Sequence, residues 1–439
     1  MAHETPPLLR LPLELQEIIY KEVLTQPFQA PQLLRVCHEI YTKALKFLFQ
    51  RALVFQSQSA LRRWIEQVPR DLLKYVGEIT FELEDVDLTP LLASAASSSV
   101  EQDNAVSPIH TWDIYERELG SLRRALGQLP NVKKLSLRTL TGRQPHLYHD
   151  FLDNVLEMIG FVYPGLRELC LDGDMHYQSL AFLRSLKALK AFSFDGFSAS
   201  EATETAEILS SLQLTDISLV SQHALLTPTL HQHSSFTSKL QSFDGSVLRT
   251  INQLASFSVT ERYSATSSAL FFTSEILCSL HNHKTLSSLS IFLSHTPEPN
   301  ALEALEEFLE KSASIERLEL DWPGLDPDVM QNYVLLPVSL LTLWIRATNM
   351  ATAFDILRNI LNSRKAGDSP RLQQVVLVRQ PWDTAAPTVQ TNKKAQGSAE
   401  SKEQQIDSPD SDSDSENVAR AKKELNDLGV RVAWCTEAS

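Results

Sequence analysis

Residues that could hold a metal ion gather in three short stretches of the chain. Histidines cluster in HALLTPTLHQH (residues 223–233) and in HNH (281–283), and DGD (172–174) resembles a fragment of a calcium-binding loop. Metal sites need imidazole, thiolate or carboxylate ligands at compatible spacing, which neither histidine cluster supplies. The other ligand positions of a calcium loop are missing around DGD. We therefore predict no metal site and no cofactor.

Serines that a kinase could modify lie in IDSPDSDSDSE (406–416). Ser408 precedes a proline, whereas Ser411, Ser413 and Ser415 alternate with acidic residues. Phosphorylation by proline-directed or acid-directed kinases would add charge and create a docking site for an arginine cluster. The alternative is a solubilising linker.

The motifs of the common enzyme classes are missing from the sequence. It contains no P-loop, no GxSxG turn, no HExxH helix and no set of kinase motifs. We predict that the chain is not an enzyme and that it has no catalytic residues.

The charge and the apolar runs restrict the partners of the chain. Its net charge of −14 disfavours a broad nucleic-acid binder, which needs clustered lysine and arginine. No apolar run reaches the ~18 residues that span a bilayer, and MAHETPP lacks the features of a secretory signal. The four cysteines are far apart in the sequence, as expected of reduced thiols. We expect a cytoplasmic or nuclear protein without nucleic-acid or membrane partners.

A repeated apolar pattern organises most of the chain. The pattern is apolar-x-x-apolar-x-apolar, and it occurs at 76–81, 132–137, 166–171, 189–194, 214–219, 254–259, 286–291, 315–320, 340–345 and 372–377. The last two apolar positions of each copy are separated by one residue, polar in most copies, and this spacing is the period of a strand. Amphipathic stretches of helical period, such as 148–162 and 300–313, separate the copies.

Ten ordered copies predict an α/β solenoid of leucine-rich-repeat type over residues 72–380. One strand and one helix cannot bury enough surface alone, so stacked copies share a core. We expect a parallel sheet on the concave side and helices on the convex side. Leu140 and Asp174 occupy the position where asparagine is usual, so the array should be irregular, with repeats that are hard to define between about 220 and 285. The alternative is an ordinary α/β sheet.

Two polar segments interrupt this pattern. ASAASSSVEQDNAVSP (93–108) is predicted to be a low-complexity loop within the array. Residues 383–417 contain almost no branched aliphatic or aromatic side chains, so we predict a disordered acidic insertion. Residues 418–434 then fit one helix and one strand that cap the array.

The N-terminal residues 8–24 and 32–50 predict two helices with more apolar surface than they can bury in each other. Pro12 stands where a helix can begin. Leu15, Ile18 and Ile19 share one side of the first helix, and a broad apolar stripe follows the second. A unit of this size is too small for a self-sufficient core. Either the repeat array or another protein must cover the surplus.

These two stretches, LLRLPLELQEIIYKEVL and QLLRVCHEIYTKALKFLF, resemble an F-box of the divergent kind found in many fungal proteins. The resemblance covers residues 8–55 and departs from the common pattern at Tyr41, where tryptophan is frequent, and at LVF (53–55), where Leu-Trp is usual. It implies a substrate-recognition subunit of an SCF-type ubiquitin ligase, with the F-box docked on a Skp-family adaptor and through it on a cullin-RING ligase. The residues implied in adaptor contact are Leu11, Pro12, Leu15, Ile18, Ile19, Leu33, Leu34, Val36, Cys37 and Tyr41.

Two alternatives stay open. The helices could cap the first repeat, or the chain could be a leucine-rich-repeat scaffold or regulator without a ligase link.

An unknown protein target is expected to bind residues that flank the last leucine of each strand. Aromatic and arginine side chains are the usual interface anchors, and they gather in the C-terminal half of the array. We predict that a basic or mixed-charge segment docks there on Phe292, Glu319, Asp321, Trp344 and Arg346.

Overall fold

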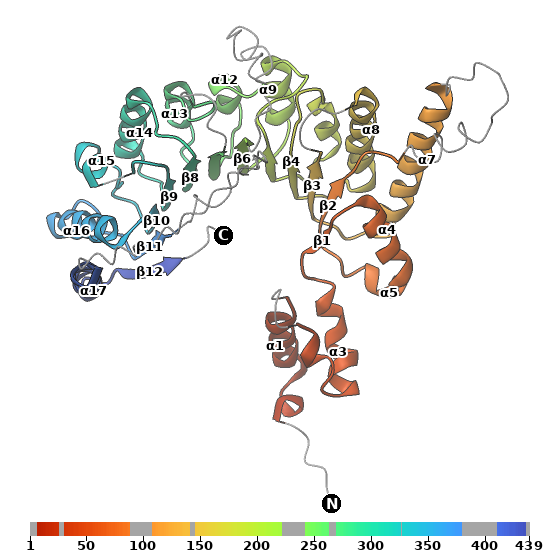
Figure 1. Ribbon diagram of the computed structural model, residues 1–439, viewed down its shortest axis with the longest axis horizontal. Helices are drawn as coiled ribbons and strands as arrows, with labels where there is room; N and C mark the ends of the chain where they lie inside the picture. Colours follow the sequence, from red (N-terminus) through yellow and green to blue (C-terminus); the bar gives the residue numbers. More distant parts are fainter. Residues whose placement is uncertain are drawn as a thin grey trace, which may run out of the picture. The chain divides into compact units, whose positions relative to one another are not determined.

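The computed structural model describes residues 7–25, 30–87, 108–140, 145–221, 242–262, 269–325, 327–379 and 411–435. It is a mixed α/β fold in which twelve strands follow chain order in one sheet, each beside its sequence neighbours (Figure 1). The strands are β1 (Leu53–Phe55), β2 (Glu78–Leu83), β3 (Lys134–Thr139), β4 (Glu168–Asp172), β5 (Ala191–Phe194), β6 (Asp216–Ser221), β7 (Ser256–Glu261), β8 (Ser288–Leu293), β9 (Arg317–Asp321), β10 (Thr342–Arg346), β11 (Gln374–Val378) and β12 (Arg431–Cys435).

Helices connect most successive strands, as a repeat of strand and helix requires. The α-helices are α1 (Leu13–Thr25), α2 (Ala30–Leu33), α3 (His38–Leu48), α4 (Gln58–Gln67), α5 (Arg70–Leu73), α7 (Pro108–Leu126), α8 (His146–Val162), α9 (Ala202–Ser210), α12 (Gly245–Arg249), α13 (Ser274–Leu280), α14 (Pro299–Lys311), α15 (Pro327–Asn332), α16 (Met350–Ala366) and α17 (Ser411–Asp427). Two 3₁₀ helices are η1 (Pro7–Arg10) and η2 (Leu180–Ser185). None of the described helices is long and apolar enough to cross a bilayer.

The repeated apolar pattern predicts the strands correctly. Strands β2 to β11 each begin inside one of the ten predicted hexapeptides, and their parallel pairing fits a repeat solenoid. In β3 the side chains of Leu135 and Leu137 are buried, whereas Ser136 and Arg138 face the other side of the sheet. The described helices lie on the apolar face of the strands (Figure 1), and the opposite face of β2 and β3 keeps half-buried or exposed side chains.

The chain divides into two compact units. The first comprises residues 1–254 and 260–265, and the second comprises 255–259 and 266–439. In the second unit, α16 shows how local chemistry sets an element's limits. Asn349 caps its first turn by accepting the Thr352 N–H at 2.8 Å, and Gly367 ends it with a φ of 88°, a left-handed conformation that glycine adopts most easily.

Two predicted boundaries need correction. LVF (53–55) is not the end of the helical domain but strand β1, which pairs with β2 in parallel, so the sheet begins before residue 72. Three residues are too few to show the strand period in the sequence.

The second correction concerns the C-terminal helix. Helix α17 begins at Ser411, so residues 411–417 belong to a helix rather than to the predicted disordered insertion. Its acidic first turns favour a helix N-terminus. Residues 93–107 and 383–410 lie outside the described residues, and Pro108 begins α7.

A buried tyrosine joins the ends of two strands in the first unit. The Tyr148 hydroxyl of α8 donates to the Leu83 carbonyl at 2.8 Å and accepts the Leu140 N–H at 3.1 Å. We expect Tyr148→Phe to lower the free energy of unfolding by about 1–3 kcal/mol, because it removes a buried hydroxyl and both of its hydrogen bonds to backbone groups. Urea unfolding measures this loss. Tyr177→Phe, at an exposed tyrosine, should change stability by less than about 0.5 kcal/mol. Equal effects of the two variants would contradict the assignment.

Candidate protein-interaction surfaces

The N-terminal helices form a small module with its own core. That core consists of Tyr20, Leu24, Leu34, Ile40, Ala44 and Phe47. Gln16, also buried, donates from Nε2 to the Leu11 carbonyl at 2.7 Å and accepts from the Lys43 ammonium of α3 at 3.4 Å. Lys46 of α3 also pairs with Glu17 of α1 at 2.5 Å. Polar and apolar contacts thus fix α1 against α3 and determine which side chains remain outside.

A set of large apolar side chains remains exposed on this helical module. Ile18 is 64% exposed and Val36 is 65% exposed. Such side chains normally belong to interfaces when several occur together. By the module apolar surface we mean these exposed apolar side chains taken together, although the helical period places Leu13 on a different side of α1 from Leu15 and Ile18; they are Leu13, Leu15, Ile18, Val36 and Tyr41.

The structure divides the ten predicted adaptor-contact residues into three groups. Leu15, Ile18, Val36 and Tyr41 are exposed, as is Pro12. Half-buried positions are Leu11, Ile19, Leu33 and Cys37. Leu34 lies in the module core and is therefore removed from the predicted docking surface. Leu13 was missed, because it occupies the variable position of the LPxEL motif.

The open sheet face of the second unit holds the predicted target-binding residues. Trp344 is half-buried, and the Arg317 guanidinium lies over its ring, 5.5 Å from the centroid. Glu319 stands beside Trp344 in the register and accepts from Arg317 Nε at 2.7 Å. Phe292 is also half-buried. These side chains form an aromatic and charged cluster that a protein segment could contact.

Two of the predicted target-binding residues are less available. Asp321 is buried, and its Oδ1 lies 3.3 Å from Nη1 of Arg346, whose side chain is also mostly covered. This pair joins β9 to β10 instead of facing a partner. Arg317 was missed, although it precedes Glu319 by two residues and so lies on the same strand face.

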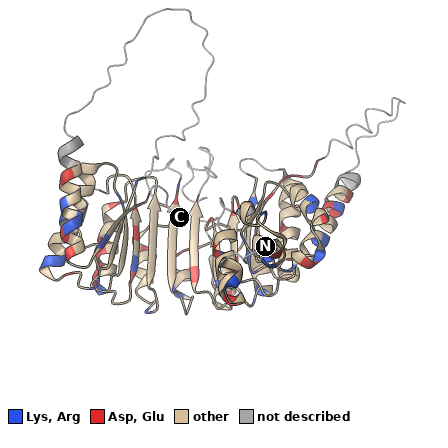
Figure 2. Ribbon diagram, turned by 90° about the horizontal axis from the view of Figure 1, so that it is seen from below, with Lys and Arg blue, Asp and Glu red and all other residues tan. Residues whose placement is uncertain are grey.

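The open sheet face of the first unit carries two ladders of charge. Lys134 lies 3.1 Å from Glu78 and 3.6 Å from Glu168. Arg138 lies 3.5 Å from Glu82 and 3.6 Å from Asp172. Lysine and arginine positions thus alternate with aspartate and glutamate positions on these strands, and Figure 2 shows both kinds of residue along the described strands and helices.

Small side chains fill the row between these ladders, namely Thr80, Ser136, Cys170 and Ser193. Burial raises the pKa of the Cys170 thiol, which therefore stays protonated.

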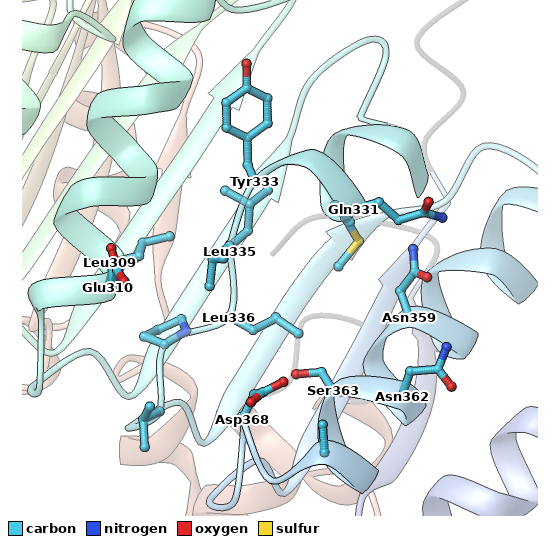
Figure 3. A pocket seen from close by; sticks show the side chains of 15 residues that line it. Leu309, Glu310, Gln331, Tyr333, Leu335, Leu336, Asn359, Asn362, Ser363 and Asp368 are labelled. Atoms are coloured by element: carbon cyan, nitrogen blue, oxygen red, sulfur yellow. The ribbon is translucent and has the colours of Figure 1, made fainter.

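A groove of about 600 Å³ lies on the helical side of the second unit, between α14, α15 and α16 (Figure 3). Leu309, Leu335 and Leu336 supply apolar walls, and Glu310 and Asp368 supply acidic ones. A second groove of about 400 Å³ lies between α7 and α8 of the first unit and includes Phe161, which is 74% exposed. Both grooves are open to solvent and could contact a protein segment.

Comparisons with known proteins leave the family open. No family model matches the chain, and no curated protein matches it. A crystal structure of a Bacteroides fragilis protein matches with 10% identity and a TM-score of 0.35, covering 80% of this chain and 83% of that one. The crystal structure of the Rad7 and Elc1 complex in yeast also matches with 10% identity and a TM-score of 0.35, covering 83% of this chain and 88% of that one. Similarity at this level assigns no function.

Proposed function

We propose that this chain is the substrate-recognition subunit of an SCF-type ubiquitin ligase. The observation that carries the proposal is the module apolar surface, with Ile18 and Val36 exposed on a module that already has a core. Nothing within the described residues covers these side chains. A Skp-family adaptor docked on α1 and on the segment that leads into α3 would remove them from water.

The chain would act by positioning, without making or breaking a bond. The helical module would bind the adaptor, which links to a cullin-RING ligase, while an open sheet face holds the target. A target lysine is thereby kept near the charged conjugating enzyme at a high effective concentration. Trp344 with Arg317 is the best-defined anchor for the target among the described residues.

Co-expression with a Skp-family adaptor tests this function. The two proteins should elute together in size-exclusion chromatography, and deletion of residues 8–50 should separate them. Separate elution of a wild-type chain with native circular dichroism would reject the ligase proposal.

A repeat scaffold without a ligase link is the second candidate. It is favoured by the open sheet faces, which could bind a protein whether or not the helical module is occupied. Under this function the target would still bind, but deleting residues 8–50 would not change the lifetime of the target in cells.

The aromatic anchor gives a prediction for target binding. We expect Trp344→Ala to reduce recovery of the targets at least tenfold, because truncating an interface tryptophan commonly costs 2 kcal/mol or more, roughly 30-fold in affinity. Proximity labelling under proteasome inhibition identifies the targets and measures their recovery. Trp112→Ala, at a partly exposed tryptophan on α7, is the matched control and should leave recovery unchanged. Unchanged recovery with Trp344→Ala would move the target site elsewhere.

A further inference from the structure

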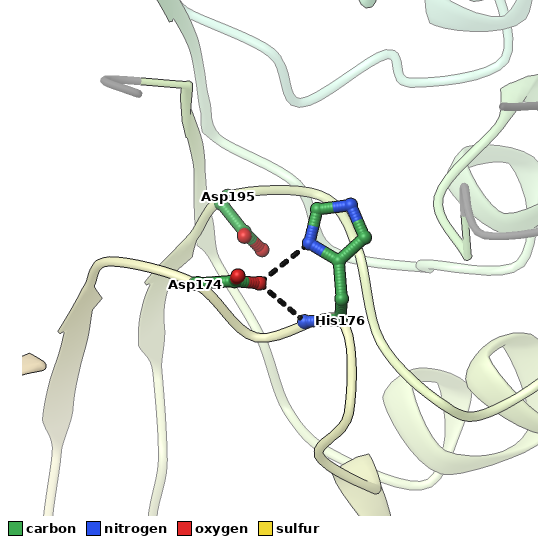
Figure 4. A group of neighbouring side chains, drawn as sticks. All are labelled: Asp174, His176 and Asp195. Carbon is green, nitrogen blue, oxygen red and sulfur yellow. Dashed lines mark hydrogen bonds and ion pairs between the residues drawn. The ribbon is translucent and has the colours of Figure 1, made fainter. Parts of the chain in front are cut away.

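Three side chains that could ligate a metal ion meet in the first unit, where the turns after β4 and β5 lie together (Figure 4). Their candidate ligand atoms, from Asp174, His176 and Asp195, all lie within 4.8 Å of one another. His176 Nδ1 is 2.6 Å from Asp174 Oδ1. Asp195 is 1% exposed and His176 is 6% exposed, so water solvates this group poorly.

The charge of this group calls for a cation. Two carboxylates meet one imidazole, and no lysine or arginine of the described residues forms an ion pair with either carboxylate. Buried carboxylates are costly unless they are paired or coordinate a metal. His176 already pairs with Asp174, so Asp195 is the carboxylate whose charge a metal ion would newly offset.

Backbone groups hold the three side chains in place. Asp195 accepts the Met175 N–H at 3.1 Å and the Phe197 N–H at 3.0 Å, and Asp174 accepts the His176 N–H at 3.0 Å. The His176 ring stacks on Phe197 with centroids 4.4 Å apart. Each Asp195 oxygen keeps a lone pair for a further ligand, whereas Asp174 Oδ1 already accepts the His176 N–H and faces His176 Nδ1. Supporting hydrogen bonds of this kind orient metal ligands in proteins.

Unpartnered polar atoms in the same loop are a second, independent observation. His176 Nε2 and Gln178 Oε1 are both buried, and neither has a protein partner among the described residues. Native structures seldom leave such atoms unsatisfied. A metal on Nδ1 would replace the hydrogen bond between His176 and Asp174, and Nε2 would then carry the proton and become a donor.

We propose that Asp174, His176 and Asp195 bind one divalent transition-metal ion of the zinc class, with water completing the coordination. Imidazole together with carboxylate suits zinc and its neighbours, whereas calcium takes six or more oxygen ligands. Ligand atoms around tetrahedral zinc lie roughly 3.3 Å apart, so on binding the widest separation would close by roughly 1.5 Å, and His176 Nδ1 and Asp174 Oδ1, now 2.6 Å apart, would separate. The ion would link two successive repeats. Sequence reasoning missed the site because Asp195 comes from the next repeat.

Titration with Co²⁺ alone, on the full chain freed of metal by a chelator, tests the site. We expect one equivalent to bind with visible d–d absorption. Asp195→Asn and His176→Gln should each weaken binding at least tenfold, because each removes one of three protein ligands. Asp172→Asn is the matched control, since it changes a neighbouring carboxylate outside the group, and it should bind as the wild type does.

Two results would overturn the proposal. One is the absence of saturable Co²⁺ binding, and the other is binding that both ligand variants retain or that shows thiolate-to-metal charge transfer. Thermal unfolding guards against a misfolded variant. Zn²⁺ should raise the Tm of the wild type and of Asp172→Asn but not that of Asp174→Asn, and an equal rise in all three would also reject the site.

Discussion

Ile18→Lys should weaken binding of the Skp-family adaptor at least about a hundredfold while leaving the chain folded. Ile18 is exposed in the free chain, so its replacement removes no packing from the module core. Glu14 and Glu22 lie one helical turn away on either side, and a lysine between them is favourable in α1. In a docked complex the same ammonium would be buried against apolar surface without a partner, which costs several kcal/mol.

The matched control is Phe161→Lys on α8. Phe161 is also exposed, and Glu157 lies four residues before it, so the new lysine meets a similar helical environment. Surface plasmon resonance with immobilised adaptor measures both variants. The control should bind as the wild type does. If both variants bound equally well, the module apolar surface would not be the docking site.

Phe194→Ala should lower the free energy of unfolding by about 3–5 kcal/mol, the usual cost of truncating a buried phenylalanine. The Phe194 ring in β5 is fully buried, and its centroid lies 4.8 Å from that of Phe192 and 6.1 Å from that of Phe243. Its removal therefore leaves a cavity lined by aromatic groups that cannot collapse easily. Urea unfolding, compared at a common m-value, measures the loss.

Phe161→Ala is the corresponding control for stability. Its side chain is exposed, so the change should stay within about 0.5 kcal/mol. A loss below about 1 kcal/mol for Phe194→Ala would show that the repeat core is not packed around this residue.

The strands could be predicted from the sequence because burial dictates their pattern. In β9, Leu318 and Leu320 must face the helices, so their alternation with Arg317 and Glu319 is visible in the sequence alone. The same logic fails for β1, where LVF has only one exposed residue between two buried ones. It fails also at the start of α17, where serines and aspartates carry no apolar period.

The interaction surfaces were less predictable because packing between elements decides them. Leu34 and Val36 are two residues apart and both apolar, yet one lies in the core and the other is exposed. Leu34 packs into the cluster that contains Tyr20 and Ile40, and this tertiary contact is not visible in the sequence. Likewise, the sequence predicts that Asp321 and Arg346 lie on one face of the sheet. It does not predict their ion pair, because the ion pair depends on how β9 and β10 lie side by side.

The most direct test of the central claim is isothermal titration calorimetry of the purified full chain with a purified Skp-family adaptor. The account predicts a saturable one-to-one complex with a negative heat-capacity change, because docking buries apolar surface. It also predicts that Ile18→Lys abolishes the signal under the same conditions. A folded wild-type chain that gives no binding isotherm, or an isotherm that Ile18→Lys leaves unchanged, would contradict the claim.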